Sequence, residues 1–404
     1  MQTEELKKLI NDRDVYIWGT RIAGLSAAKI LPAHNIKVKA FVDSIACNNN
    51  KLELEVISPE ELFRTNLQDK FIIICTRGHS PHIKKTCMQK NLTKNDFIEW
   101  EKIQHFDYYI EINNRCNLSC LTCSVREYYN EPLMNMSITD FKTILKKIRK
   151  EDPFASWINL FGHNEAFLNG SLAEMIELSN NLDLSVGLST NLAFSKDFKN
   201  VIKAKPLWLR VSMSGWGENY SVIHRGGKFD ILLKNLRLLS EYREKYSKNT
   251  MVEVFFHRYK HNEKDIEHAK ELCNSLNFEF RCIYASIIGF ETVSNILDGR
   301  AVSLKTQKAL SYLCHSVSHT AKQALKQKDF PCPNDHLVRI HSDLTVAECQ
   351  AWMGSVMPGV IFTDISLDEL ESKLSNTRFC KICKPRGLHQ FCEVVFDEDI
   401  INKG

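Results

Sequence analysis

Three cysteines within eight residues constrain this chain more than any other feature. Cys116, Cys120 and Cys123 have the spacing CxxxCxxC. They follow residues 108–112, whose alternating apolar side chains predict a strand that ends just before them. Thiolates grouped in this way select iron–sulfur clusters, zinc or Cu(I). A zinc site would need a fourth ligand nearby, usually from a second CxxC, and none follows Cys123 closely. Because only three thiols are local, one metal position is expected to stay open.

This motif resembles the signature of the radical S-adenosylmethionine (SAM) superfamily, which lies after the first strand of a partial barrel. In that family the three cysteines hold three irons of a 4Fe–4S cluster, and SAM chelates the fourth iron through its amino and carboxylate groups. The resemblance implies these roles for Cys116, Cys120 and Cys123. Thr122 stands where the family often has an aromatic residue, which reduces the expected packing against adenine.

Length and composition favour a folded cytoplasmic protein with metal-binding cysteines. The 404 residues suggest two to three domains, and a net charge of +4 gives no reason to expect nucleic acid or a membrane surface as partner. No apolar run is long enough to span a membrane, and the N-terminus lacks a signal-peptide core. Fourteen cysteines in a reducing compartment indicate metal ligation rather than disulfides. Six have no partner at ligand spacing and are expected to be packing residues: Cys47, Cys75, Cys87, Cys273, Cys282 and Cys314.

The first hundred residues predict a Rossmann-like α/β domain, assigned to residues 1–103. A strand at 14–18 is followed by a glycine turn, a helix and a second strand that ends in Asp43. Gly19, Arg21, Gly24 and Asp43 are the candidates for binding a nucleotide or a phosphorylated group, although Arg21 replaces the middle glycine of the usual fingerprint. A degenerate domain that serves docking or dimerisation is the open alternative.

Strand and helix patterns then alternate six times. Strands are predicted near 108–113, 157–161, 184–189, 207–213, 251–257 and 278–286. Such alternation predicts a parallel sheet with right-handed crossovers, closed only in part, over residues 104–290. The fold class is therefore α/β, with a partial (β/α)6 barrel of TIM type whose functional groups gather at the carboxyl ends of the strands.

Several strand ends resemble the SAM site of the family. Gly162 and Glu165 match a motif that holds the SAM amino group, and Ser189 and Asn191 match a turn at the ribose. Ser212 would lie near SAM, and Arg225 would pair with its carboxylate. Read without the resemblance, these residues are an ordinary turn acid, a Ser/Asn turn and surface loop charges. His257 and Tyr284, at the fifth and sixth strands, are candidate catalytic residues that could equally be structural.

A second set of cysteines lies in residues 291–404, which begin with predicted linking helices. Cys332 and Cys349 flank a predicted hairpin, and Cys380 and Cys383 form a CxxC. Four thiolates would complete one 4Fe–4S cluster, but on spacing alone a structural zinc fits equally well. The resemblance to the SPASM/twitch branch of the superfamily implies one auxiliary 4Fe–4S cluster, with Cys392 outside it.

The family resemblance implies that a reduced cluster cleaves SAM and that the resulting radical removes a hydrogen from the substrate. A fully ligated auxiliary cluster would accept an electron, which favours a net oxidation. The front domain suggests a small nucleotide-linked or phosphorylated substrate, such as a sugar, and a flavodoxin or ferredoxin would supply electrons. The alternatives are a peptide-modifying maturase, an epimerase that uses Cys282 or Cys314 as hydrogen donor, and a non-enzymatic iron–sulfur carrier or sensor.

Overall fold

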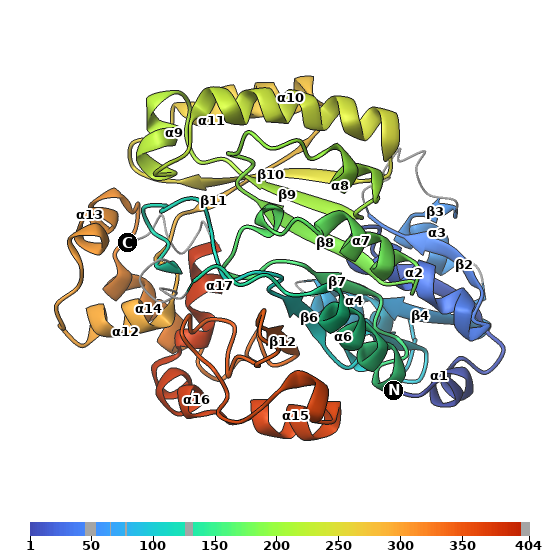
Figure 1. Ribbon diagram of the computed structural model, residues 1–404. Coiled ribbons are helices and arrows are strands. Elements are labelled where there is room, and N and C mark those ends of the chain that lie inside the picture. The colour runs from blue at the N-terminus through green and yellow to red at the C-terminus, as the bar shows by residue number, and fades with distance from the viewer. Residues whose placement is uncertain (45–53, 65, 77–78, 126–131, 397–404) are drawn as a thin grey trace. The chain divides into compact units, whose positions relative to one another are not determined.

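The computed structural model describes residues 1–44, 54–64, 66–76, 79–125 and 132–396 (Figure 1). Cys47, a predicted packing residue, lies outside the described residues. The chain divides into two compact units, described separately below. The first comprises Met1–Asp107, Lys142–Ile158 and Leu178–Val186, and the second comprises Tyr108–Phe141, Asn159–Glu177 and Gly187–Gly404. The domain limits placed at residues 103 and 290 stay a prediction.

The N-terminal part forms a five-stranded parallel sheet of order β3-β2-β1-β4-β5. Its central strands read DVYIW and KFIII, continuous apolar runs that suit strands buried on both faces. Val15 and Ile17 of β1 pack into one core, and Tyr16 and Trp18 pack into another. This strand order is that of the first five strands of a Rossmann-type sheet. Successive strands are added on one side of β1 up to β3 and on its other side from β4 on, so the order reverses between β1 and β4. The elements are α1 (Thr3–Ile10), β1 (Asp14–Trp18), α2 (Ile22–Ile30), η1 (Leu31–His34), β2 (Val38–Val42), β3 (Val56–Ile57), α3 (Pro59–Arg64), β4 (Lys70–Ile74), α4 (Ser80–Gln89), β5 (Phe97–Glu99) and η2 (Trp100–Lys102).

The second sheet has seven strands in the order β11-β10-β9-β8-β7-β6-β12. Strands β6 to β11 follow chain order, so the predicted partial barrel of six β/α units is confirmed. The strands are β6 (Asp107–Ile110), β7 (Trp157–Asn159), β8 (Ser185–Thr190), β9 (Trp208–Ser212), β10 (Met251–Arg258), β11 (Glu279–Tyr284) and β12 (Leu337–Ile340). The helices that accompany β6 to β11 are α6 (Ile138–Glu151), η3 (Ala166–Leu168), α7 (Leu172–Asn180), α8 (Lys199–Lys203), α9 (Glu218–Ile223), α10 (Phe229–Tyr246) and α11 (Asp265–Ser275).

Beyond the barrel, the chain continues in short helices and one hairpin. The hairpin starts with β12, and an antiparallel bridge joins Ile340 to Val346, as predicted. The sequence did not predict that β12 would extend the barrel sheet beside β6, where Glu111 N donates to Ile340 O over 2.8 Å. The last helix, α17, packs against β11 and α14, at the red end of the chain in Figure 1. The elements are α12 (Phe290–Leu297), α13 (Leu304–Tyr312), α14 (Val317–Lys326), η4 (Phe362–Asp364), α15 (Leu367–Leu374), α16 (Arg378–Cys383), η5 (Lys384–Arg386), η6 (Leu388–Gln390) and α17 (Phe391–Phe396).

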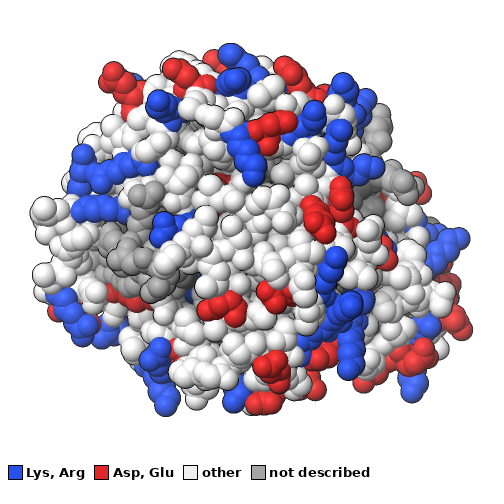
Figure 2. Space-filling view, in the orientation of Figure 1, with Lys and Arg blue, Asp and Glu red and all other residues white. Residues whose placement is uncertain are grey.

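Across the described parts of the chain, none of the helices combines the length and apolar composition that crossing a lipid bilayer requires. The face drawn in Figure 2 carries Lys, Arg, Asp and Glu intermixed, without a large area of one sign. This distribution agrees with the nearly balanced charge of the sequence.

A buried acid, Glu111, ties the start of the barrel to the hairpin. Its Oε2 lies 2.7 Å from Nδ1 of His341, and its Oε1 accepts the backbone N–H of His163 over 2.8 Å. Burial by itself raises the pKa of Glu111, but the hydrogen bond and charge of His341 and the charge of Arg339 outweigh it and lower the pKa to about 2. Gly162 is required beside it, because a Cβ there would lie 2.3 Å from Glu111 Oε1.

Glu111 should therefore make the fold acid-sensitive. Its pKa in the folded state lies below that of the unfolded chain, so its contribution is complete above about pH 4.5 and is lost as the pH falls toward about 2. A pKa lowered from 4.5 to about 2 corresponds to roughly 3 kcal/mol of stability. We expect Glu111→Gln to lower the free energy of unfolding at neutral pH and to make the acid unfolding of the metal-free chain less steep. Tryptophan fluorescence as a function of pH measures both. Glu241→Gln, at an exposed position of α10, is the control, and an unchanged acid transition in Glu111→Gln would contradict the assignment.

Candidate iron–sulfur and SAM site

The three clustered cysteines open onto one pocket of about 430 Å³ in the second unit. Its other walls come from the carboxyl ends of β8 to β11 and from residues near them. Two backbone hydrogen bonds fix the cysteine loop: Ser119 N donates to Arg225 O over 2.9 Å, and Leu121 N donates to Ile223 O over 2.8 Å. The loop is thus anchored on the segment at the end of α9.

The chemistry of the three thiols fits a polynuclear metal group. Burial raises the pKa of Cys116 to about 12 and also raises that of Cys120. Glu165 and Cys123 add to the first shift, and Cys123 and Cys116 add to the second. Clustered thiols that oppose each other's ionisation need a cationic group before they can ionise together. Donors to sulfur are already in place on Cys116, from Leu118 N at 3.5 Å and Asn191 Nδ2 at 3.6 Å.

Within the described ranges, no three or more His, Cys, Asp or Glu side chains converge on the position of a single metal ion. A 4Fe–4S cluster makes a different demand, because each thiolate binds its own iron atom.

Glu165 is buried at the pocket wall, where it is 1% exposed. Its two carboxylate oxygens accept backbone N–H groups, from Phe167 at 3.2 Å and from Asn191 at 2.8 Å. Burial raises its pKa to about 7, against the lowering effect of these donors. A cationic ligand such as the SAM ammonium would favour the ionised carboxylate. The structure places Gly162 not in this pocket but in an adjoining hollow that the three cysteines also line.

The other residues predicted to bind SAM fall into two groups. Ser189, Asn191 and Ser212 line the pocket, whereas Arg225 does not. Asn191 is tied to the cysteine loop, since its Nδ2 also donates to Asn117 Oδ1 over 2.9 Å. Arg225 contacts the loop through its backbone carbonyl. The role of each in binding SAM stays a prediction.

Both candidate catalytic residues line the same pocket. His257 Nδ1 lies 3.1 Å from Ser214 Oγ, and burial, followed by the charge of Arg210, lowers the pKa of His257 to about 4. The hydroxyl of Tyr284 accepts a hydrogen bond from Arg258 Nη1 over 3.2 Å. His257 is therefore a neutral imidazole in the pocket, and Tyr284 is held by a cation. Their catalytic role stays a prediction.

His224 also lines the pocket, although the sequence did not single it out, and the alternative that this loop carries surface charges is wrong for His224. It is 4% exposed and stacks on Tyr220 at 4.8 Å between ring centroids. Its Nε2 accepts the backbone N–H of Ser214 over 3.0 Å, so in the neutral ring the proton is on Nδ1. That Nδ1 lies 3.4 Å from Cys120 Sγ and donates to the sulfur.

We expect this hydrogen bond to tune the cluster. A donor to a ligating sulfur stabilises the reduced, more negative state. His224→Phe should therefore lower the midpoint potential by tens of millivolts, measured by a redox titration that is followed by electron paramagnetic resonance. His261→Phe removes an imidazole that does not line the pocket and serves as the control. An unchanged potential in His224→Phe would rule out a hydrogen bond that matters to the cluster.

The four cysteines of the second set also come together. Burial raises the pKa of Cys332, Cys349 and Cys383, and the charges of other members of the set, Cys380 included, raise each of them further; Asp335 also raises that of Cys332. Cys392, which is exposed, shows no such influence. It lines the pocket of the first three cysteines instead. Neither Cys282 nor Cys314 is among the residues that line that pocket.

Arg339 organises the loop that carries Cys349. This side chain is 1% exposed and donates to the carbonyls of Cys349, Gln350, Trp352 and Met353 and to the hydroxyl of Ser355 at 3.0–3.4 Å. The Ser355 hydroxyl in turn accepts the backbone N–H of Cys349 over 3.4 Å. One buried guanidinium thus fixes the backbone of a candidate ligand and of the residues that follow it.

In the N-terminal unit, the predicted nucleotide-binding residues form a closed turn. Asp43 Oδ2 accepts the backbone N–H of Thr20 over 3.1 Å and its hydroxyl over 2.6 Å. Gly24 is needed for packing, because a Cβ there would lie 1.9 Å from Gly19 O, and Gly19 itself has φ +118°. Arg21 is exposed at the start of α2. Nucleotide binding by these four residues stays a prediction.

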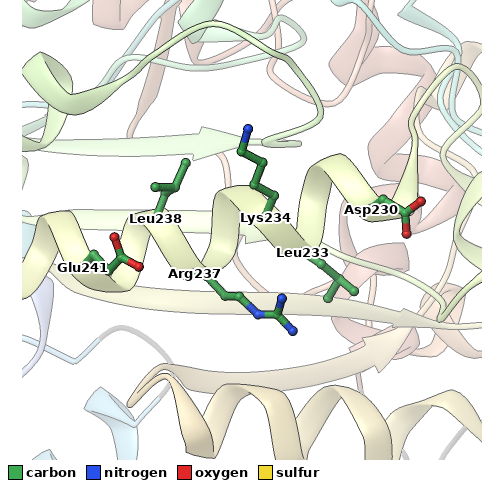
Figure 3. A pocket seen from close by; sticks show the side chains of 6 residues that line it. All are labelled: Asp230, Leu233, Lys234, Arg237, Leu238 and Glu241. Atoms are coloured by element: carbon green, nitrogen blue, oxygen red, sulfur yellow. The ribbon is translucent and has the colours of Figure 1, made fainter.

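A second hollow, of about 390 Å³, runs along the exposed side of α10. Figure 3 shows that its lining residues all project from this one helix: Asp230, Leu233, Lys234, Arg237, Leu238 and Glu241. It shares no residue with the cysteine pocket, and its mixed charges are those of a solvated helix face.

Comparisons with known proteins assign the barrel. Residues 110–273 match the model described as the Radical SAM superfamily. No curated protein matches the chain. Similar solved structures include BtrN in complex with AdoMet and 2-DOIA, with 13% identity and a TM-score of 0.42, covering 72% of this chain and 91% of BtrN. SuiB from Streptococcus suis, bound to S-adenosylmethionine, has 14% identity and a TM-score of 0.47, with 76% and 71% covered. Native anSMEcpe with bound AdoMet has 15% identity and a TM-score of 0.44, with 72% and 84% covered.

Proposed function

We propose that this chain, in which residues 110–273 form a radical SAM domain, is a SPASM/twitch-type enzyme that oxidises a small organic substrate. The observation that carries the proposal is the shared pocket, because Cys116, Cys120 and Cys123 line one cavity together with Glu165 and His257. A cluster site and a site for an ammonium group are therefore combined with room for a further ligand.

The residues present fit the cofactors that a radical SAM domain uses, a 4Fe–4S cluster and SAM. The three cysteines would hold the cluster, and Glu165 would receive the SAM amino group, as Ser189, Asn191 and Ser212 line the space beside it. When bound, the pair supplies a radical that removes hydrogen from unactivated C–H bonds. The protein contributes orientation and exclusion of water: Ile223, Tyr259, Ile287 and Phe290 are apolar and buried in the same lining.

The four cysteines of the second set support an oxidative outcome. Cys332, Cys349, Cys380 and Cys383 supply four thiolates, enough to complete an auxiliary 4Fe–4S cluster with no position for substrate. Such a group could take one electron from the substrate radical; loss of the hydroxyl proton to solvent would then complete a two-electron oxidation such as alcohol to ketone. The reducing partner would be a flavodoxin or ferredoxin, and the N-terminal unit favours a nucleotide-linked or phosphorylated, sugar-like substrate.

The first test is production of 5′-deoxyadenosine by the anaerobically reconstituted chain with SAM and a chemical reductant. A radical SAM enzyme forms it, even slowly without substrate. A non-enzymatic iron–sulfur carrier or sensor binds iron but forms none, and that result would overturn the proposed function.

Epimerisation is the second candidate, because the Cys392 thiol lines the pocket. Its S–H bond could return a hydrogen atom to the substrate radical, and the sulfur radical left behind would then need one electron and one proton from the reducing partner. Turnover in D2O separates the two outcomes. Epimerisation places solvent deuterium on the product and fails in Cys392→Ser, whereas oxidation leaves no solvent deuterium at that carbon and survives the substitution.

A further inference from the structure

One cation in the pocket has no part in the function proposed so far. Arg210 lies on β9 and lines the pocket between Ser189 of β8 and His257 of β10. We propose that its guanidinium binds an anionic group of the substrate, a carboxylate or a phosphate. This inference rests on the proposed function, since the pocket must also hold the cluster and SAM.

Aromatic rings hold the Arg210 guanidinium in one position. Its Cζ lies 5.1 Å from the ring centroid of Phe161, 5.6 Å from Trp208 and 5.0 Å from Phe255. Cation–π contacts of this kind are attractive and fix the plane of the guanidinium. Its Nε donates to Ser189 Oγ over 3.1 Å, which fixes the rotation of the group within that plane.

The outer nitrogens of Arg210 are left for a ligand. Among the described residues, neither Nη1 nor Nη2 donates a hydrogen bond to a protein acceptor, and Arg210 forms no ion pair. Arg210 is half-buried, and its outer nitrogens are not enclosed by the protein, so they are open to the pocket; burial still lowers the pKa of Arg210. Four N–H donors of fixed geometry can therefore bind a group with several oxygen atoms.

The charges around Arg210 do not cancel its own. Glu253 attracts the guanidinium but Arg281 opposes it. Glu165 is the one Asp or Glu among the described lining residues, and both of its oxygens already accept backbone N–H groups. The subsite keeps a positive charge, so the pocket favours an anion there.

His257 supplies a neutral donor beside this charge. Ser214 Oγ accepts the backbone N–H of His257 over 3.1 Å, which leaves its hydroxyl hydrogen for His257 Nδ1. The ring proton is then on Nε2. A guanidinium with an adjacent imidazole N–H matches the paired oxygens of a carboxylate or phosphate.

The test is binding of inorganic phosphate and of succinate to the reconstituted chain with SAM present, by isothermal titration calorimetry. Arg210→Gln should weaken the preferred anion by roughly 10- to 100-fold, because it loses a charged donor pair. Arg210→Lys should weaken it less but still clearly, since an ammonium cannot bind both oxygens from a ring-stacked position. The anion that binds more tightly identifies the anionic group of the substrate as a phosphate or a carboxylate. The matched control is Arg281→Gln, an exposed arginine that also stacks on Phe255, at 5.6 Å, and does not line the pocket.

Three results would overturn the subsite: no binding of either anion by the wild type, equal anion affinity in Arg210→Gln, or weakened SAM binding with anion affinity unchanged. The last would assign Arg210 to SAM. If Arg210→Gln does not fold, judged by its thermal unfolding midpoint, Arg210→Lys decides. Failure of the proposed function shows differently, as a wild type that forms no 5′-deoxyadenosine whatever its affinity for anions.

Discussion

Cys120→Ala abolishes formation of 5′-deoxyadenosine, reducing it to the level of a blank without protein. The substitution removes one of three thiolates and also the sulfur that accepts the His224 hydrogen bond. A cluster held by two thiolates loses its iron readily and cannot present an open position to SAM. The measurement is liquid chromatography of the reaction with SAM and reductant, together with iron content.

Cys282→Ala is the matched control, because that thiol lies on β11 outside the pocket lining. It should cleave SAM at the wild-type rate. Full cleavage by Cys120→Ala would show that the three cysteines do not hold the SAM-binding cluster.

Arg339→Met destabilises the second unit by about 3–5 kcal/mol, the range expected when a buried charged partner is removed. Four carbonyls and one hydroxyl lose a donor together, and they belong to the loop that carries Cys349. We therefore expect the iron of the auxiliary site to be lost at lower denaturant concentration than the iron of the SAM site. Urea unfolding followed by circular dichroism and by the visible absorbance of the clusters measures both.

Arg300→Met tests a similar change at an arginine whose side chain is 68% exposed. It should shift stability by less than about 0.5 kcal/mol. If Arg339→Met unfolds like the wild type, then the hydrogen bonds of Arg339 do not hold the loop.

The barrel and the cysteine sites could be predicted because their signals are local. The CxxxCxxC loop spans eight residues, and each strand from β6 to β11 appears as an apolar run where the sequence placed one. Patterns of this kind depend only on neighbours in the chain, so they can be recognised without knowledge of the tertiary structure. The addition of β12 to the sheet could not be foreseen, because its partner β6 is more than two hundred residues away.

The pocket residues that the sequence did not predict are brought there by the tertiary structure. His224 had one usable signal, since Tyr220, Ile223 and His224 have the i, i+3, i+4 spacing of one helix face; Tyr220 and Ile223 are buried on α9, and His224 is buried as its C-cap. Arg225, the next residue, does not line the pocket, although the sequence predicted that it binds the SAM carboxylate. Cys392 reaches the pocket only because α17 packs on β11, and Arg210 is recognisable as a binding group only through the rings of Phe161 and Phe255 beside it. No spacing in the sequence encodes those contacts.

The most direct test of the two-cluster account is iron and sulfide per chain after anaerobic reconstitution, for the wild type and for the Cys116, Cys120 and Cys123 triple alanine variant. Two 4Fe–4S clusters predict about eight iron atoms in the wild type and about four in the variant. Values of about four and near zero, with zinc bound, would contradict the account. They would make the second cysteine set a structural metal site and remove the argument for oxidation.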